Sequence, residues 1–454
     1  MKKHSISKEL EKKILILDGG MGSLIQEFGL TEEDFRGEMF ANWELPLKGC
    51  NDLLAVTRPD VISDIHLRYL EAGADIISTD TFNANPISLA DYGLHEWAYK
   101  INKAAALAAR AVADEITGRD VSKPRFVGGS VGPTNRTASI SADISNTAVR
   151  DVTFEELADG YSTQIEGLVD GGVDIIQLET FFDTLNCKAA IFAAESVFEK
   201  KGVRLPVMVS GTLTNSGRTL SGQTVEAFYA SVEHAEPFAV GFNCSFGARQ
   251  LLPFLKRLSD VSQYPISVYP NAGLPNPSSG YDETPEMMAA DVEEYLRQGL
   301  VNIVGGCCGT TPAHRAAIAD IAANYKPRTV NEHRSRTSLS GLEPLYIDEN
   351  SNFINIGERA NVAGSAKFAR LIREEKYGEA LSIAGAQIEG GSSVIDICVD
   401  DGLIDGAAAM ARFLNMAEAE PEIARAPFMI DAADWGGAEA GPRWAWGKSI
   451  GQSR

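Results

Sequence analysis

The sequence predicts an α/β protein, a (β/α)8 TIM barrel followed by an incomplete second β/α barrel. A short apolar run that ends abruptly in polar or glycine residues recurs eight times within residues 1–325, and a helix-length segment follows each run. The runs are apolar throughout, which is typical of strands buried on both faces of a parallel sheet. Eight such units fit a closed barrel. A doubly wound open sheet is the alternative, but no Gly-x-Gly-x-x-Gly follows the first strand.

Each predicted strand is followed by polar residues or glycines. In chain order, the strands with these ends are residues 14–20, 75–81, 126–130, 174–180, 207–211, 239–244, 266–271 and 302–308. A barrel brings the carboxyl ends of its strands to one mouth, and the long segment after the first strand, through 35–40 and 48–52, would roof it. We therefore expect a common site formed by Asp18, Asp80, Ser130, Glu179, Ser210, Asn243, Cys244, Asn271, Cys307 and Cys308.

The rest of the chain predicts a second, smaller unit. We expect the barrel to span residues 1–325, a linker 326–350, and a β/α unit 351–454, because residues 326–341 are polar and without apolar periodicity. The predicted elements are a strand at 353–356, a helix at 366–389, a strand at 394–397, a helix at 407–417 and a strand at 428–430. About three β/α units cannot close a barrel, so we expect 428–430 to be an open apolar edge, with early proteolysis beyond Lys326.

Composition narrows the function classes. The chain has 454 residues and a formal net charge of −21, which disfavours nucleic acid and anionic membranes as partners. The first apolar run is too short for a signal peptide, and the sequence predicts no transmembrane span. Six cysteines in a chain of this length do not make a disulfide framework. We therefore expect a cytoplasmic protein, whose paired cysteines bind metal or do chemistry.

Three cysteines stand at predicted strand ends. Cys307 and Cys308 are adjacent in a glycine-rich turn, and Cys244 ends another strand. Three thiols with room for a fourth ligand suit a soft metal, and zinc is the expected ion. A substrate thiol in the fourth position would lose its proton at neutral pH and become a good nucleophile towards a methyl group. The competing interpretations are buried cysteines that act as small hydrophobic residues and a redox switch.

Carboxylates at the same mouth suggest an amino-acid substrate. Asp18 and Glu179 can bind an ammonium group, with Gly19 allowing close approach of the backbone, or they can belong to a hydrogen-bond network of the barrel. Backbone N–H groups around Ser130, in residues 128–134, could bind the substrate carboxylate, or this stretch is a simple turn.

Two histidines receive structural interpretations. His314 follows Thr311 and Pro312, which is a typical helix start, so we expect it to cap a helix. His66 lies in Asp64–Tyr69, which superficially resembles a corrinoid Asp-x-His-x-x-Gly motif, but Tyr69 replaces the glycine and we reject that interpretation.

Together, four motifs resemble the homocysteine S-methyltransferase family: residues 18–22, 177–181, 241–244 and 305–312. Residues 35–38, 48–52 and 136–139 narrow the resemblance to the first module of the cobalamin-dependent methionine synthases. Residues 351–430 resemble the start of the methyltetrahydrofolate-binding barrel of that family, notably 355–362 and 364–368.

The resemblance implies that Cys244, Cys307 and Cys308 bind zinc and that homocysteine thiolate takes the fourth position. Asp18, Gly19 and Glu179 would hold its amino-acid end, and methylcobalamin on a separate module or protein would supply the methyl group. In the second unit, the resemblance points to Glu358, Asn361 and Asp396 as pterin contacts. Ala360 and Cys398 depart from the family pattern, as does the region after Asp431, where Trp435 stays in register, so we expect no methyltetrahydrofolate binding.

Three functions follow as alternatives. The chain is a zinc-dependent module that activates homocysteine for methionine formation, a stand-alone homocysteine methyltransferase that uses a small donor such as S-methylmethionine, or a catalytically incomplete fragment. A methyl-transfer assay with each donor separates them.

Overall fold

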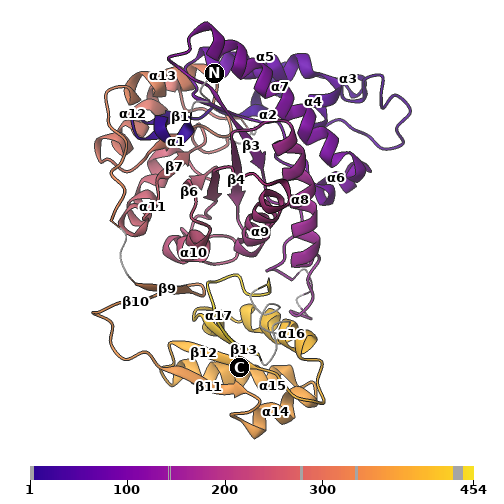
Figure 1. Ribbon diagram of the computed structural model, residues 1–454, viewed down its shortest axis with the longest axis vertical. Coiled ribbons are helices and arrows are strands. Elements are labelled where there is room, and N and C mark those ends of the chain that lie inside the picture. The colour runs from indigo at the N-terminus through magenta and orange to yellow at the C-terminus, as the bar shows by residue number, and fades with distance from the viewer. Residues whose placement is uncertain are drawn as a thin grey trace.

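The computed structural model describes residues 5–141, 143, 145–276, 280–332, 336–432 and 443–453. Its larger part is an eight-stranded, all-parallel sheet in the order β1-β8-β7-β6-β5-β4-β3-β2 (Figure 1). A parallel bridge between Leu17 and Ile76 joins β1 to β2, so the sheet closes into the predicted (β/α)8 barrel. The strands are β1 (Leu15–Ile16), β2 (Ile76–Ser78), β3 (Phe126–Val131), β4 (Ile175–Phe181), β5 (Val207–Gly211), β6 (Ala239–Asn243), β7 (Ile266–Tyr269) and β8 (Ile303–Val304).

Helices surround this sheet (Figure 1). They are α2 (Met21–Glu27), α3 (Glu32–Arg36), α4 (Leu54–Thr57), α5 (Pro59–Glu71), α6 (Pro86–Leu89), α7 (Ala98–Arg119), α8 (Phe154–Asp170), α9 (Thr184–Lys201), α10 (Val225–Val232), α11 (Ala248–Val261), α12 (Pro285–Arg297) and α13 (Pro312–Ala322). Capping boxes begin α3, α8 and α13. At the other end of the strands, α1 (Ile6–Leu10) inserts Ile6 and Leu10 into an apolar cluster with Leu15, Phe126 and Ile175, which closes the base of the barrel.

The predicted linker is folded in part. Arg328 lies buried against the barrel, where its guanidinium donates hydrogen bonds to the carbonyls of Ser259 and Ser262. An antiparallel hairpin of β9 (Thr337–Ser340) and β10 (Pro344–Ile347) follows. Its β9 strand reaches α10, where the hydroxyls of Ser340 and Ser231 are hydrogen-bonded at 2.8 Å. The absence of apolar periodicity in 326–341 concealed this strand, because polar serines make its contacts.

A second parallel sheet has the order β11-β12-β13-β14. Its elements are β11 (Ile356–Asn361), α14 (Ala366–Arg373), α15 (Tyr377–Glu389), β12 (Val394–Cys398), α16 (Gly406–Glu418), α17 (Pro421–Ala424), β13 (Phe428–Ala432) and β14 (Ile450–Ser453). Three expectations were wrong. The first strand of this unit is Ile356–Asn361 and not 353–356, where Phe353 is exposed. Strand 428–430 is not an open edge, because β14 pairs with it. The helix expected over 366–389 is two helices, separated where Glu375 adopts a φ of 54°. Trp435 lies outside the described residues.

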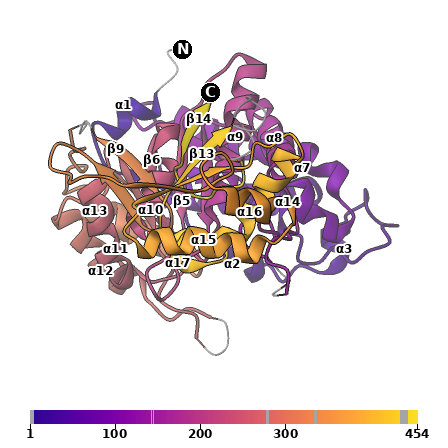
Figure 2. The same ribbon diagram turned by 90° about the horizontal axis from the view of Figure 1, so that it is seen from below.

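The second unit packs against the barrel, and in the view from below it lies in front of the barrel (Figure 2). Trp446 is 5% exposed and belongs to the apolar cluster of the barrel. Lys188 of α9 donates hydrogen bonds to the carbonyls of Ala445 and Gly447 at 2.8 and 2.9 Å. Arg150 donates to the Asn415 carbonyl at 2.8 Å. The contact between the two units therefore combines an inserted indole with charged side chains bound to backbone carbonyls.

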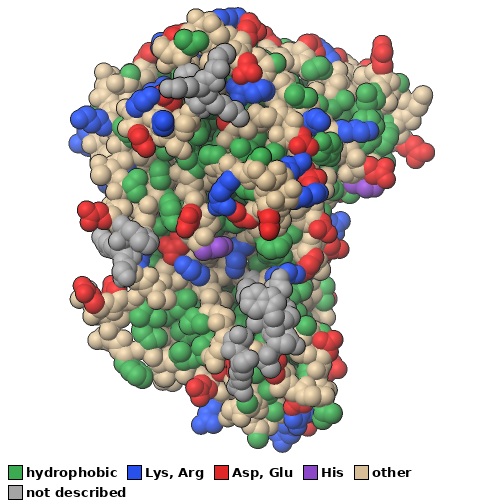
Figure 3. Space-filling view, in the orientation of Figure 1, with side chains coloured by type: hydrophobic (Ala, Val, Ile, Leu, Met, Phe, Trp, Pro, Cys, Tyr) green, Lys and Arg blue, Asp and Glu red, His purple; other side chains and the backbone are tan. Residues whose placement is uncertain are grey.

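The surface carries charges of both signs, interspersed over the face shown in Figure 3. Apolar side chains gather in the lower left of this view, over the second unit. Phe353 and Leu403 of that unit are 91% and 83% exposed. In the part of the chain that the structure describes, no helix is long and apolar enough to cross a membrane.

Candidate metal centre and substrate pocket

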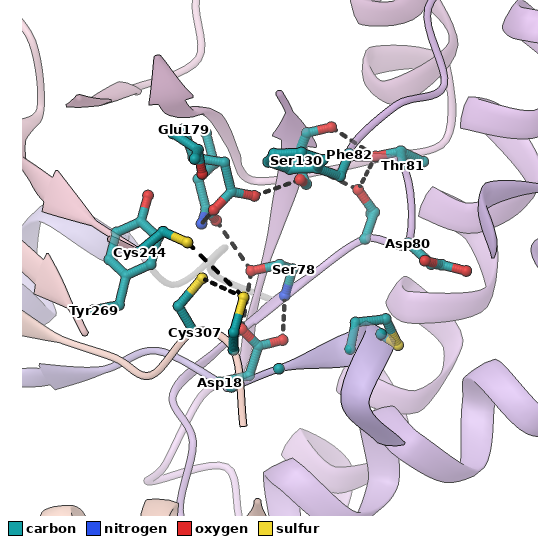
Figure 4. A pocket seen from close by; sticks show the side chains of 18 of the residues that line it. Asp18, Ser78, Asp80, Thr81, Phe82, Ser130, Glu179, Cys244, Tyr269 and Cys307 are labelled. Carbon is teal, nitrogen blue, oxygen red and sulfur yellow. Dashed lines mark hydrogen bonds between the residues drawn. The ribbon is translucent and has the colours of Figure 1, made fainter. Parts of the chain in front are cut away.

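A cavity of about 430 Å³ lies at the carboxyl ends of the barrel strands. Seven of the ten residues expected at a common site line it, namely Asp18, Asp80, Ser130, Glu179, Cys244, Cys307 and Cys308. Figure 4 shows six of them around one space. The other three lie behind this lining and support it: Ser210 donates to Asn243, and Asn271 accepts a hydrogen bond from the Cys308 N–H. Asn51 and Asp52 of the expected roof also reach the cavity.

The three cysteines meet as the sequence predicts. The Sγ atom of Cys308 lies 3.8 Å from that of Cys244 and 3.9 Å from that of Cys307. All three sulfur atoms lie within 4.8 Å of one another. A tetrahedral zinc site with bonds of about 2.3 Å places its sulfur ligands about 3.8 Å apart, so the spacing fits zinc. The Cys244 thiol, followed by that of Cys307, holds the pKa of Cys308 well below its ordinary value.

The local backbone explains how the thiols converge. Cys244 and Ser245 both have a φ of 61°, a left-handed conformation that side chains rarely adopt, and this turns the chain sharply after β6. Gly309 has a φ of 76°, and a Cβ there would lie 2.3 Å from the Tyr281 ring. The turn after β8 therefore requires glycine, and it directs Cys307 and Cys308 towards Cys244.

Asn243 is the residue whose role the sequence did not reveal. Its Oδ1 accepts hydrogen bonds from the Thr180 N–H at 2.9 Å and from the Ser210 hydroxyl at 2.7 Å. Its Nδ2 donates to the Thr180 hydroxyl at 2.6 Å and points to Cys307 Sγ at 4.0 Å. Thr180 also has a φ of 61°. Asn243 therefore stabilises a strained backbone beside Glu179 and contacts a candidate metal ligand. The only sequence feature that pointed to this role was its position directly before Cys244.

Asp18 is oriented by one residue of the neighbouring strand. Its two carboxylate oxygens accept hydrogen bonds from the Ser78 N–H at 2.7 Å and the Ser78 hydroxyl at 2.9 Å. Burial raises the pKa of Asp18 to about 7, against these hydrogen bonds. Gly19 follows, and a Cβ there would lie 2.6 Å from Thr310 Oγ1, so the packing of Thr310 against this backbone requires glycine.

Glu179 is held in a similar way. It accepts hydrogen bonds from the Ser130 hydroxyl and from Gln177 Nε2. Burial raises the pKa of Glu179 to about 7. The expected role of residues 128–134 in binding a carboxylate is not supported, because the Ser130 N–H donates to Thr79 and the Gly132 N–H donates to the Phe82 carbonyl. The Ser130 hydroxyl instead orients Glu179.

The two histidines considered from the sequence, His314 and His66, have structural roles outside this site. His314 forms a capping box with Thr311 at the start of α13, which confirms its structural interpretation. His66 is fully buried in α5, and burial lowers its pKa to about 4. Among the described residues, the only group that could hold a metal is Cys244, Cys307 and Cys308.

In the second sheet, polar residues converge at the carboxyl ends of three strands. Asn361 Nδ2 donates to Asp396 at 2.8 Å and to Asp431 at 3.3 Å, and all three side chains are buried. Glu358 does not join them, because it lies exposed in the irregular part of β11. Asp431 was not singled out from the sequence, although it directly follows the apolar run 428–430.

Two family models match the chain. One, described as homocysteine S-methyltransferase, matches residues 15–322, and one described as pterin binding enzyme matches residues 357–450. The chain is similar in structure to the metallated form of the homocysteine methyltransferase MmuM from Escherichia coli, with 24% identity and a TM-score of 0.53, over 69% of this chain and 98% of that one. The oxidized form of MmuM matches at 23% identity and a TM-score of 0.53, over 68% and 95%. Because both sequence identities are below 25%, these two structural matches indicate a shared fold only.

Proposed function

The chain belongs to the homocysteine S-methyltransferase family and is a methyltransferase, and we propose that it activates homocysteine at a zinc centre for methyl transfer to give methionine. The observation that carries this proposal is the approach of three thiols to within 4.8 Å of one another in a cavity that also contains Asp18 and Glu179. The thiols suit a soft metal, and the carboxylates suit an ammonium group. Homocysteine carries both complementary groups, a thiol and an ammonium.

Cys244, Cys307 and Cys308 would hold the metal. Zinc, when bound, would supply a Lewis acid that favours the thiolate form of the substrate sulfur at neutral pH. Asn243 supports this centre through its contact with Cys307, as hydrogen-bonding neighbours of metal ligands generally do.

Asp18 and Glu179 would bind the substrate ammonium in their ionised forms. Ser78 orients the Asp18 carboxylate, and Ser130 and Gln177 orient the Glu179 carboxylate. Both hydrogen-bond acceptors are therefore in position before the substrate binds. The substrate sulfur, four bonds from the ammonium nitrogen, would then be free to reach the cysteines. Gly19 lines the cavity beside Asp18, and its backbone would meet the amino-acid end of the substrate.

For the methyl donor, we propose methylcobalamin carried by another module or protein. The support is the combination of the two matched models in one chain, because a pterin-binding unit beside this barrel resembles the cobalamin-dependent methionine synthases. The thiols must stay reduced, which favours the cytoplasm as the compartment. Glu358, Asn361 and Asp396 correspond, by resemblance, to pterin contacts, although we expect no folate binding by this chain, and of the three only Asn361 and Asp396 share a buried cluster.

A methyl-transfer assay tests this function. The zinc-loaded full chain is incubated with homocysteine and free methylcobalamin or, separately, S-methylmethionine, and methionine is measured. Methionine from methylcobalamin alone supports the proposal, and methionine from S-methylmethionine alone supports a stand-alone enzyme with a small donor. No product from either donor, with zinc and homocysteine bound, identifies a catalytically incomplete chain.

A further inference from the structure

Arg315 is an arginine that the fold buries completely and leaves without hydrogen bonds from its side chain. It is 0% exposed, and its Nε, Nη1 and Nη2 atoms have no hydrogen-bond partner among the described residues. Removing a guanidinium from water without pairing its N–H groups is costly. Arg315 also lies near the N-terminus of α13, the end of a helix at which a positive charge is unfavourable. Packing alone therefore does not explain an arginine at this position.

A second buried arginine of the barrel, Arg328, shows the ordinary structural use of this side chain. Arg328 is 5% exposed, and its guanidinium donates hydrogen bonds to the Ser259 hydroxyl and to the carbonyls of Ser259 and Ser262. These bonds fix the segment after α13 against the barrel. Because Arg315 makes no such bonds, its guanidinium acts on its surroundings through its charge.

The Arg315 guanidinium lies directly behind the wall of the substrate pocket. Gly306 lines the cavity, whereas Arg315 is not part of the lining. A Cβ on Gly306 would lie 2.7 Å from Arg315 Nη2, so the absence of a side chain at Gly306 leaves room for the guanidinium. The Gly306 N–H donates to the Asp18 carbonyl at 3.0 Å. Arg315 and Asp18 therefore flank the same glycine, one behind the wall and one in the cavity.

The charges of the cavity connect Arg315 to Asp18. None of the described residues that line the cavity is Lys, Arg or His, whereas four of them are Asp or Glu. Burial raises the pKa of Asp18 to about 7 and the charge of Glu179 adds to this rise, whereas the charge of Arg315 opposes it. Arg315 therefore favours the ionised form of Asp18, which is the form that attracts an ammonium group.

We propose that Arg315 is a positioning residue of the substrate pocket, which acts through Asp18 and not by contact with the substrate. The inference rests on the proposed function in one respect, that Asp18 binds the ammonium group of homocysteine. Because Arg315 donates no hydrogen bond to Asp18, the carboxylate remains available to the substrate beside its bonds to Ser78. An apolar residue at position 315 would avoid the unfavourable burial of a charge, but it would no longer favour the ionised carboxylate.

Binding of three ligands to the zinc-loaded full chain at pH 7 tests this role by calorimetry. The ligands are homocysteine, aminopropanethiol, which lacks the carboxylate of homocysteine, and mercaptobutanoate, which lacks its ammonium group. In Arg315→Met we expect the two ligands with an ammonium group to bind about tenfold more weakly, because less Asp18 is ionised. Mercaptobutanoate affinity and zinc content should stay unchanged. Equal weakening of all three ligands would indicate a structural role, and weakening of mercaptobutanoate but not of aminopropanethiol would indicate attraction of the carboxylate. Either result would overturn the inference, as would unchanged homocysteine binding.

Further variants separate action through Asp18 from an effect on folding. In the Asp18→Asn background, Arg315→Met should cause no further loss of homocysteine affinity, because the two residues act as a unit. Additive losses would overturn the inference. Arg315→Met should unfold at the same or a higher urea concentration than the wild type, since it removes an unpaired buried charge. Arg328→Met is the matched control, and it should lose stability and keep its affinity for all three ligands. Absence of homocysteine binding to the wild type would instead contradict the proposed function.

Discussion

Asn243 and Thr180 are joined by two hydrogen bonds, from the Thr180 N–H to Asn243 Oδ1 at 2.9 Å and from Asn243 Nδ2 to the Thr180 hydroxyl at 2.6 Å. The same amide points to Cys307. One side chain thus connects the strand that bears Glu179 to the thiol centre. Because Thr180 and Cys244 both adopt left-handed conformations, this connection also compensates backbone strain on each side of it.

Replacement of Asn243 by alanine should weaken zinc binding. We expect a loss of about 10- to 100-fold in affinity, which is typical when a neighbour that supports a metal ligand is removed. Loss of buried hydrogen bonds should also lower the free energy of unfolding by about 2 kcal/mol. Chelator competition and urea unfolding measure the two effects. Asn302→Ala is the matched control, because Asn302 is buried and hydrogen-bonded at the opposite end of β8, and it should lose stability and keep zinc affinity.

Metal stoichiometry tests the thiol centre directly. Protein purified under reducing conditions should carry about one zinc, because three thiolates and one exchangeable ligand complete a tetrahedron. Alanine at Cys244, Cys307 or Cys308 should remove most of the metal, whereas Cys398→Ala in the second unit should retain it. Metal analysis by mass spectrometry gives the result, and full retention of zinc by Cys244→Ala would contradict the site.

Homocysteine affinity should fall as the pH drops below about 7. Burial raises the pKa of Asp18 and of Glu179 to about 7, so both carboxyls become protonated there and lose their attraction for the substrate ammonium. At pH 7 binding should release protons from these carboxyls and from the substrate thiol, which calorimetry in different buffers detects. Asp18→Asn should bind weakly at pH 8 and show a shallower loss towards pH 6. A flat profile in the wild type would exclude these carboxylates as ammonium ligands.

The same pKa shifts have a stability consequence whose sign is opposite to that of ordinary surface carboxylates. Because the folded-state pKa values of Asp18 and Glu179 lie above those of the unfolded chain, their contribution is favourable at low pH and is lost as the pH rises through about 7. Asp18→Asn cannot ionise, so the free energy of unfolding of this variant should improve relative to wild type between pH 5 and pH 8. Thermal unfolding of the metal-free protein at both pH values measures this difference.

The docked second unit changes the expectation for proteolysis. Trp446 packs in the barrel cluster and Lys188 binds two carbonyls of the same segment, so cleavage between Lys326 and Thr337 should be slow in the wild type. Trp446→Ala and Lys188→Met should accelerate it and leave a stable barrel that keeps its zinc. Lys200→Met, on the exposed side of α9, is the control. Thermolysin digestion followed by mass spectrometry locates the cuts, and identical rates in all variants would refute the role of this contact.

Methyltetrahydrofolate should not bind measurably to the full chain. Asn361, Asp396 and Asp431 form a suitable polar cluster, but Glu358 lies exposed and Cys398 stands where the related pattern has an amide. Equilibrium dialysis with labelled folate tests this. Saturable binding that is lost in Asp396→Ala would show that the second unit is functional.

The barrel and its thiols were predictable because their signals are local. Each strand is a short apolar run, and each ligand or carboxylate stands directly after one, so strand order alone places Asp18, Glu179 and the cysteines at one mouth. The match to the homocysteine S-methyltransferase model over residues 15–322 covers this barrel. The division of the chain at residues 325 and 351 stays a prediction.

What the sequence concealed depends on contacts between distant segments. The β9 strand is polar and is stabilised by Ser231 of α10, and β14 follows a stretch without apolar periodicity. The Ser130 N–H donates to Thr79, a contact that no spacing reveals, and a substrate contact of Ser130 stays a prediction. Asp52 was expected only as part of the roof, since its burial arises from the fold of the roof around it.

The shortness of β8 has a consequence for the molecule without its metal. β8 pairs with β1 and with β7 through only two residues on each side, and the turn after it carries Cys307 and Cys308. An ion shared with Cys244 would tie the ends of β6 and β8 together across β7. Without the ion, only those few residue pairs hold β8 between β1 and β7. Amide hydrogen exchange at Ile303 and Val304 should then quicken first, so that a chelator acts as a local denaturant before any loss of the remaining fold.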